Sequence, residues 1–199
     1  MKRLTTILIA ILSIASLQAQ TAKQVLDKTA ATVGRKGGAS ASFSISSPNL
    51  GTSQGTIAIK GNQFKATTPD AVIWYDGKTQ WTYMASTEEV NITTPTKNQQ
   101  AALNPYTFIN LYKEGFTLSQ QVKGNHFVIT MKAQDAKRSI QQMVVTIQKD
   151  TYVPSQVKML QGGEWTTISI SNFKAANQPD GLFTFNAKDY PDAEVIDLR

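Results

Sequence analysis

The stretch Gly61–Ile92, GNQFKATTPDAVIWYDGKTQWTYMASTEEVNI, decides the fold of this 199-residue chain. Two short aromatic-rich runs, Ala71–Tyr75 and Gln80–Met84, flank Asp76-Gly77-Lys78-Thr79, a combination typical of a β-hairpin. A third run, Glu88–Thr93, follows after a polar break. Aromatic side chains crowd this stretch, yet few of its groups could perform chemistry. The stretch therefore predicts antiparallel strands that bind a ligand through shape and hydrophobic contact.

Short strands bounded by turns continue on both sides of this stretch. Upstream, Ala22–Val33 has apolar residues at helical spacing and ends at Gly34, which predicts one amphipathic helix. The other expected strands are Ser42–Ser46, Gly55–Lys60, Gln63–Ala66, Phe116–Lys123, Phe127–Lys132, Ile140–Lys149, Val153–Leu160, Trp165–Phe173 and Leu182–Phe185. This many short strands with tight turns favours an antiparallel sheet large enough to curl.

The strands offer one apolar and one polar face, and few helices are available to cover the apolar one. Ile129 and Met131 alternate with polar residues, and so do Met143 and Val145. Thr94–Tyr112 adds two helix-like pieces separated at Asn104-Pro105, giving about three helical segments in all. The pattern fits an ordinary core filled by helices, the commoner use of an apolar face, and it also fits a covered cavity.

Composition bounds the class of protein. Lys2, Arg3 and the apolar run Leu4–Leu17 before Ala19 predict a secretory signal peptide at residues 1–19, with an N-terminal anchor as the alternative. One soluble domain is expected over residues 20–199, without disulfides, because the chain has no cysteine. The formal charge is +6, and it falls to +4 when Lys2 and Arg3 are removed. The remaining lysines are scattered singly, which argues against nucleic-acid binding and is compatible with an anionic membrane or an acidic partner.

Candidate catalytic groups are few. His126 is the only histidine and follows a Gly-Asn turn, so a surface role is favoured over that of a catalytic base. With one histidine and no cysteine, Cys-His catalysis is excluded and a His-based zinc site is disfavoured. Gly77-Lys78-Thr79 resembles the end of a phosphate loop but joins two strands rather than a strand and a helix. We therefore expect neither an enzyme nor a bound cofactor or metal.

The aromatic stretch resembles the LolA-type periplasmic lipoprotein carriers. In that family a strand ending in Phe and a basic residue leads to a Pro, an "SDG"-like hairpin, a Trp, a Tyr and an acidic-Val pair. The matching positions here are Phe64-Lys65, Pro69, Asp76-Gly77, Trp81, Tyr83 and Glu89-Val90.

The resemblance extends along the chain. Asn104-Pro105 to Ile109 is similar to the family's lid helix, and Phe127–Lys132 is similar to its Phe-x-Leu-x-Pro strand, with Met131 in place of the proline. The family's closing pattern matches Leu182–Phe185 followed by Tyr190-Pro191 and Glu194-Val195-Ile196. In studied members of that family an arginine directly follows the matched Phe and acts as a latch that hydrogen-bonds the lid and holds the empty cavity shut. Lys65 stands there in this chain and lacks the planar fork of donors of arginine.

The resemblance implies an α+β fold, mostly antiparallel β: an unclosed, strongly curved barrel whose three or so short helices form a lid over a hydrophobic cavity. It implies a monomeric periplasmic carrier that takes lipoprotein acyl chains from an inner-membrane ABC transporter to an outer-membrane acceptor or the membrane itself. A carrier or sensor of phospholipid or glycolipid on the same fold is the alternative. Phe108 and Ile109 would line the lid, and Lys65 would latch it. The expected cavity wall is Ile57, Ile59, Phe64, Ile73, Trp81, Tyr83, Ile129, Met131, Met143, Val145 and Met159.

Overall fold

A computed structural model describes residues 20–49, 51–96 and 111–199. Its helices are α1 (Ala22–Val33) and the short 3-10 helices η1 (Leu111–Lys113), η2 (Asp180–Phe183) and η3 (Ala187–Asp189). Its strands are β1 (Ala39–Ser47), β2 (Gly51–Lys60), β3 (Gln63–Thr67), β4 (Ala71–Tyr75), β5 (Gln80–Met84), β6 (Glu89–Thr93), β7 (Phe116–Lys123), β8 (His126–Ala133), β9 (Ile140–Gln148), β10 (Pro154–Gln161), β11 (Glu164–Lys174) and β12 (Glu194–Asp197). The predicted signal peptide, residues 1–19, lies outside the described residues.

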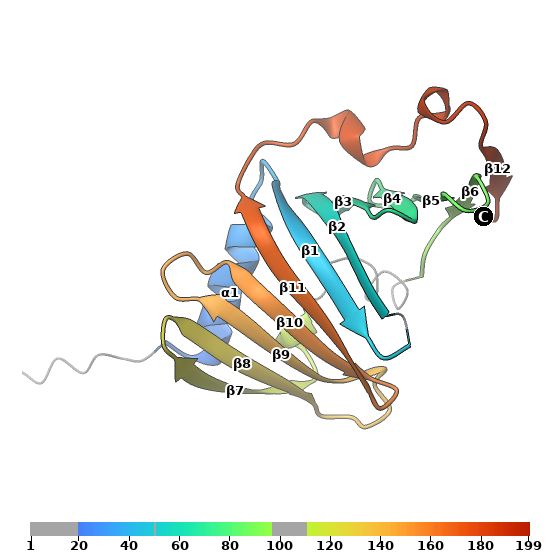
Figure 1. Cartoon of the computed structure of the whole chain (residues 1–199). Coiled ribbons are helices and arrows are strands. Elements are labelled where there is room, and N and C mark those ends of the chain that lie inside the picture. The colour runs from blue at the N-terminus through green and yellow to red at the C-terminus, as the bar shows by residue number, and fades with distance from the viewer. Residues whose placement is uncertain (1–19, 50, 97–110) are drawn as a thin grey trace, which may run out of the picture.

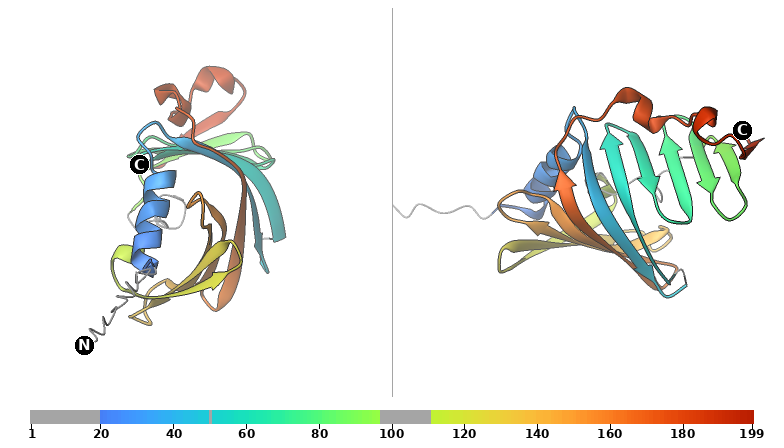
Figure 2. Two further views of the ribbon diagram at one scale, coloured as in Figure 1. Left: turned by 90° about the vertical axis from the view of Figure 1, so that its left-hand side faces the viewer. Right: turned by 45° about the horizontal axis from the view of Figure 1, so that its top comes forward.

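One twelve-stranded sheet contains every strand in the order β12-β6-β5-β4-β3-β2-β1-β11-β10-β9-β8-β7. All neighbouring pairs are antiparallel except β12–β6, which is parallel. The sheet curls strongly around α1 without closing, because its edge strands β7 and β12 are not neighbours (Figures 1 and 2). The mostly antiparallel, unclosed and curved architecture expected from the sequence is therefore confirmed.

Helix α1 begins and ends at the predicted residues, because hydrogen bonds fix both of its ends. The Thr21 hydroxyl accepts a hydrogen bond from the backbone of Gln24, whose side chain accepts one from the Thr21 N–H in return. At the other end the Gly34 N–H donates to the Ala30 carbonyl at 2.8 Å. None of the helices among the residues described is long and apolar enough to cross a membrane.

The aromatic hairpin forms as the sequence predicts, with Tyr75 opposite Gln80. Asp76 organises its turn: one carboxylate oxygen accepts from the backbone N–H groups of Lys78 and Thr79 at 2.8 and 2.7 Å. Gly77 has φ +103°, a conformation that side-chain-bearing residues rarely adopt. The Asp-Gly pair thus fixes the register of β4 and β5 locally.

One expectation for the C-terminal segment, residues 175–199, is wrong. Leu182–Phe185 is not a strand: η2 occupies the first part of it after Pro179, and Phe183 is fully buried. Glu194–Asp197, for which the sequence predicted no strand, forms β12 and pairs with β6. Alternating apolar residues predicted a strand, but here they anchor a segment that crosses the sheet outside its hydrogen-bond ladder (Figure 2).

The expected helical lid is not confirmed. Among the described residues only α1 is an α-helix, and η1 is a single short turn that follows residues 97–110. The predicted lid residues Phe108 and Ile109 lie outside the described part of the chain.

Candidate functional site

The inner face of the sheet, defined as the face that packs against α1, brings together most of the predicted wall. Directly opposed residues of neighbouring strands point to the same side of a sheet, so the register assigns each side chain. Met131 lies opposite Met143, and Met143 lies opposite Met159. These three side chains form a methionine row across β8, β9 and β10, and they are 1%, 1% and 8% exposed.

A second row runs beside the methionine row and is longer. Its pairs place Ile45, Ile168, Val157, Val145 and Ile129 side by side, one each from β1, β11, β10, β9 and β8. Ile129 is fully buried and Val145 is 7% exposed, whereas Ile45, Val157 and Ile168 are half-buried. The inner face is therefore apolar across five strands without interruption along this row.

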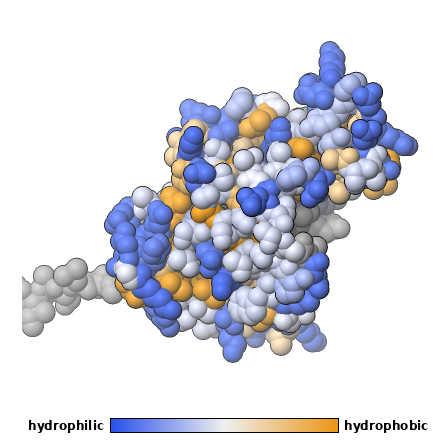
Figure 3. All heavy atoms as spheres, in the orientation of Figure 1, coloured by the Kyte–Doolittle hydropathy of each residue, from blue (hydrophilic) through white to orange (hydrophobic). Residues whose placement is uncertain are grey.

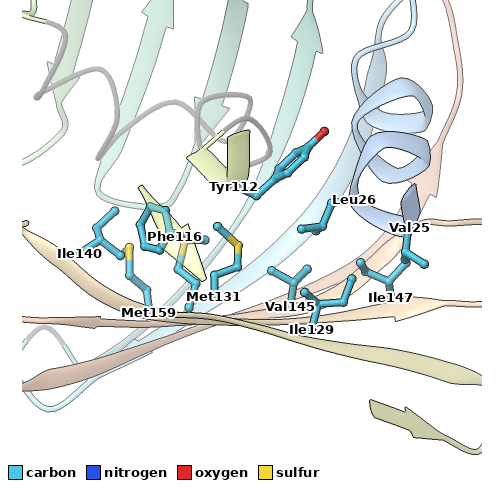
Figure 4. Packing of buried hydrophobic residues seen from close by; sticks show 11 residues of the cluster. Val25, Leu26, Tyr112, Phe116, Ile129, Met131, Ile140, Val145, Ile147 and Met159 are labelled. Carbon is cyan, nitrogen blue, oxygen red and sulfur yellow. The ribbon is translucent and has the colours of Figure 1, made fainter. Parts of the chain in front are cut away.

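Helix α1 covers one end of this surface. Val25 and Leu26 point from the helix toward Ile129, Val145 and Ile147 (Figure 4). The remaining buried members of this first cluster are Tyr112, Phe116, Met131, Ile140, Met143 and Met159.

Tyr112 connects η1 to α1 through a polar contact at the edge of the first cluster. Its hydroxyl donates to one oxygen of Asp27, whose other oxygen accepts from Lys23 at 2.8 Å. The hydrogen bonds from Lys23 and Tyr112 lower the pKa of Asp27 below its ordinary 3.8. Burial, followed by the bond to Asp27, raises the pKa of Tyr112.

Replacing Tyr112 by phenylalanine is expected to cost about 1 kcal/mol of stability at pH 7, the usual net value of one hydrogen bond. Because the folded pKa of Asp27 is lowered, its contribution is complete above the unfolded pKa and is lost as pH falls through the folded value. The difference between wild type and variant should therefore shrink below about pH 4. Urea unfolding at pH 7 and pH 3 measures it, and a difference that grows on acidification would contradict this linkage.

A second apolar cluster occupies the inner face of β2, β3 and β4. Its buried members are Ile59, Phe64 and Tyr75, joined by Val33 from the last turn of α1. The Phe64 and Tyr75 rings have their centroids 5.6 Å apart. The predicted wall residues Ile57 and Ile73 pack against this cluster half-buried.

The predicted wall missed inner-face residues near the middle of the sheet, among them four on β1 and β11. Phe43 lies opposite Ile170, and Ile45 lies opposite Ile168, on the paired strands β1 and β11. A Cβ on Gly55 would lie 2.8 Å from the Phe43 ring and 2.2 Å from the Thr67 carbonyl oxygen, so only glycine fits beside this ring. The alternation of each strand was visible in the sequence, but the pairing of β1 with β11, far apart in the chain, was not.

Trp81 and Tyr83 do not join this wall. The register pairs Trp81 with Trp74 and Tyr83 with Val72, whereas Ile73 lies opposite Thr82. Both aromatic residues therefore point to the outer face, opposite to Phe64 and Ile73. The prediction placed β5 one residue out of register with β4, and a shift of one residue inverts the faces of a strand.

Lys65 also lies on the outer face, which corrects the expected latch. Its strand neighbour Phe64 is buried inside, and the Lys65 ammonium lies 5.3 Å from the centre of the Trp74 ring. A residue that latches a lid over the inner face would have to point the other way.

The outer face is covered locally by the C-terminal segment. The Trp74 ring packs edge-on against the rings of Phe185 and Tyr190, with centroids 5.5 and 5.4 Å apart. The centroids of the Tyr83 and Tyr190 rings are 4.6 Å apart. A pocket of about 300 Å³ lies at this contact, lined by Lys65, Trp74, Gly181, Leu182, Thr184, Asn186, Asp189 and Tyr190. Elsewhere the outer face is mainly hydrophilic or neutral, with apolar residues in small patches (Figure 3).

In the part of the chain that the structure describes, metal-ligating side chains do not gather at one point. No group of three or more His, Cys, Asp or Glu residues within it could hold a metal ion. His126 lies half-buried at the start of β8, at the β7–β8 turn as the sequence predicts. The arrangement offers apolar surface and adaptable thioether side chains, which suit the binding of hydrocarbon.

Comparison with known proteins identifies relatives. The model of a family described as outer membrane lipoprotein carrier protein LolA matches residues 12–163. No curated protein matches the chain in sequence.

Solved structures share the architecture at low sequence identity. An uncharacterised conserved protein from Thermus thermophilus is similar with a TM-score of 0.61 and 14% identity, over 89% of this chain and 99% of that chain. A LolA superfamily protein from Nitrosomonas europaea gives 0.46 and 13%, over 84% and 99%. MucB in its complex with MucA from Pseudomonas aeruginosa gives 0.45 and 11%, over 82% and 60%. The first of these similarities supports the fold alone.

Proposed function

The chain belongs to the family of LolA outer membrane lipoprotein carrier proteins, and from this membership we propose that it binds the acyl chains of lipoproteins on its inner face and carries them from the inner to the outer membrane. The observation that carries this proposal is the uninterrupted apolar row across β1, β11, β10, β9 and β8. Its members on β1, β11 and β10 are only half-buried, so the inner face retains apolar surface that α1 does not cover.

The physical need for such a carrier follows from the solvent. Each CH₂ group of an acyl chain contributes about 0.8 kcal/mol when it leaves water for an apolar environment. An acylated protein therefore does not leave a membrane unaided at a useful rate. An apolar inner face offsets most of this cost, and the methionine row can repack around chains of different length because thioether side chains are unbranched and flexible. Release then needs only a destination that is still more apolar.

The wider setting is proposed from the family. The carrier would act in the periplasm as a single domain over residues 20–199, after removal of residues 1–19. It would receive cargo from an inner-membrane lipoprotein-releasing ABC transporter and deliver it to an outer-membrane acceptor or to the membrane itself. This transfer of cargo would require no cofactor. Phe108 and Ile109 stay the proposed lid residues, whereas Lys65 is not carried over as a latch because its ammonium lies over Trp74.

Native mass spectrometry of the protein purified from its own periplasm tests the proposal. We expect bound lipoprotein or lipopeptide, and we expect Ile168→Gln to reduce the loaded fraction about tenfold, because a polar group enters the apolar row at a half-buried position. Leu160→Gln is the matched control: Leu160 is also half-buried, but it lies opposite Trp165 on the outer face. This control should load like wild type.

Each result is decisive. Equal loading of both variants would remove the inner face as the binding surface. Bound phospholipid or glycolipid in place of lipoprotein would keep the binding surface and move the function to lipid transport or sensing. Protein that is empty and also ignores added lipoprotein and lipid would overturn the carrier function, leaving the inner face as a core.

A further inference from the structure

The outer face carries a pocket that the proposed carrier function does not use. Its volume is about 300 Å³, at the lower end of the range for small-molecule sites. Lys65 of β3 and Trp74 of β4 lie opposite each other in the sheet and form one wall. Residues of the C-terminal segment between Gly181 and Tyr190 form the other wall. The pocket therefore exists only where this segment packs against the sheet.

The wall from the C-terminal segment is held on both sides of the pocket. On one side the Lys60 ammonium donates to the Gln178 carbonyl at 3.1 Å, and Phe183 is fully buried. On the other side the Tyr190 ring packs edge-on against Trp74. Both ends of the wall are thus fastened to the sheet, so the pocket is formed before a ligand arrives.

Lys65 brings a positive charge to this pocket. The residue is half-buried, and its ammonium lies 5.3 Å from the centre of the Trp74 ring. A ring face attracts a cation, but it does not replace the acceptors that the three N–H donors of an ammonium would have in water. No ion pair within residues 20–49, 51–96 and 111–199 includes Lys65. This end of the pocket therefore lacks an anionic acceptor.

Asp189 brings a negative charge to the same pocket from η3. Like Lys65, it belongs to none of the ion pairs formed by the described residues, so the two opposite charges do not pair with each other. Burial raises the pKa of Tyr190, and the neighbouring Tyr83 and Asp189 raise it further. The carboxylate thus acts on the aromatic ring beside it, and this end of the pocket lacks a cation.

We propose that the pocket binds a small zwitterion, with the anionic group of the ligand on Lys65 and its ammonium between Asp189 and the Tyr190 ring. An anion alone would be attracted by Lys65 and repelled by Asp189, and a cation alone would meet the reverse. A molecule with both charges gains both attractions, and the tyrosine ring adds a cation–π contact. Free amino acids and phosphoethanolamine share this chemistry. The site lies on the face opposite to the proposed cargo surface, and the inference does not depend on the carrier function.

Isothermal titration calorimetry of the protein purified from its own periplasm, at low ionic strength, tests the inference with four probes. Glycine and phosphoethanolamine are zwitterions, whereas inorganic phosphate and ethanolamine each carry one of the two charges. We expect at least one zwitterion to bind with a Kd on the order of 1 mM, about tenfold more tightly than either single-charge probe. Binding of glycine would identify a free amino acid as the source of the ligand, and binding of phosphoethanolamine alone would identify a headgroup.

Three variants locate the site. Lys65→Met and Asp189→Asn should each weaken binding of the zwitterion about tenfold, because each removes one of the two charges. Lys188→Met is the matched control: it changes the net charge as Lys65→Met does, but Lys188 is exposed and does not line the pocket. This control should bind like wild type. Thermal melting shows whether each variant is folded.

The results that would overturn the inference are distinct. If phosphate or ethanolamine alone binds as tightly as the zwitterions, the pocket does not read both charges. If neither zwitterion binds, or if all three variants bind like wild type, the pocket is not their site. The comparison of the four probes within wild type decides the matter even if a variant does not fold, and none of these results bears on the carrier function.

Discussion

Replacing Phe183 by alanine is expected to lower the free energy of unfolding by about 3–5 kcal/mol, the usual cost of deleting a buried phenylalanine ring. Phe183 is 0% exposed, and it is the only buried side chain of the C-terminal segment, residues 175–199. Its loss should loosen the segment that covers the outer face. Trp74, now 3% exposed beneath Phe185 and Tyr190, should then become accessible to water.

Urea unfolding measures the change in stability, and tryptophan fluorescence reports the exposure of Trp74 through a shift to longer wavelength. Leu198→Ala is the control within the same segment: Leu198 is 61% exposed, so its truncation should change stability by less than about 0.5 kcal/mol. If Phe183→Ala and Leu198→Ala behave alike, the C-terminal segment is not anchored as the structure shows.

Replacing Met143 by alanine is expected to cost about 2–5 kcal/mol, the range for large-to-alanine changes in a core. Met143 is the middle of the methionine row, 1% exposed between Met131 and Met159. Alanine leaves a cavity bounded by flexible neighbours. Met131 and Met159 can collapse into part of it, which favours the lower half of the range.

Chemical denaturation of three variants distinguishes packing from other effects. Met143→Leu conserves volume and should cost less than about 1.5 kcal/mol. Met84→Ala truncates a half-buried methionine at the end of β5 and should cost less than Met143→Ala. A Met143→Ala variant as stable as Met143→Leu would mean that the methionine row is not packed in the free protein, but lines empty space.

Part of the aromatic stretch lies on the outer face, where its side chains have a role different from lining the inner face. Trp74, Tyr83 and Lys65 belong to the stretch that resembles the carrier family, yet Trp74 and Tyr83 contact Tyr190 of the C-terminal segment, and Lys65 lies over the Trp74 ring. A family pattern can therefore combine residues that face the proposed cargo with residues that fasten the chain's own end. The order of the motif along the chain does not separate these two roles.

The sequence by itself determined the local elements. The ends of α1 follow from the Thr21–Gln24 capping box and Gly34, and the bounds of β4 and β5 follow from the turn at Asp76-Gly77. Period-two alternation also placed the methionines and isoleucines of β8 and β9 on one face correctly. These features depend on residues a few positions apart, so the physics that fixes them can be read along the chain.

Only the tertiary structure decided which faces meet and what covers them. The pairing of β1 with β11 aligned Phe43 and Ile45 with the wall, the register of β5 turned Trp81 and Tyr83 outward, and the return of the C-terminal segment made β12 from a tail without a clear pattern. These outcomes arise from contacts between residues distant in sequence. Alternation defines two faces for each strand, but curvature, register and long-range pairing decide which of them becomes the inside.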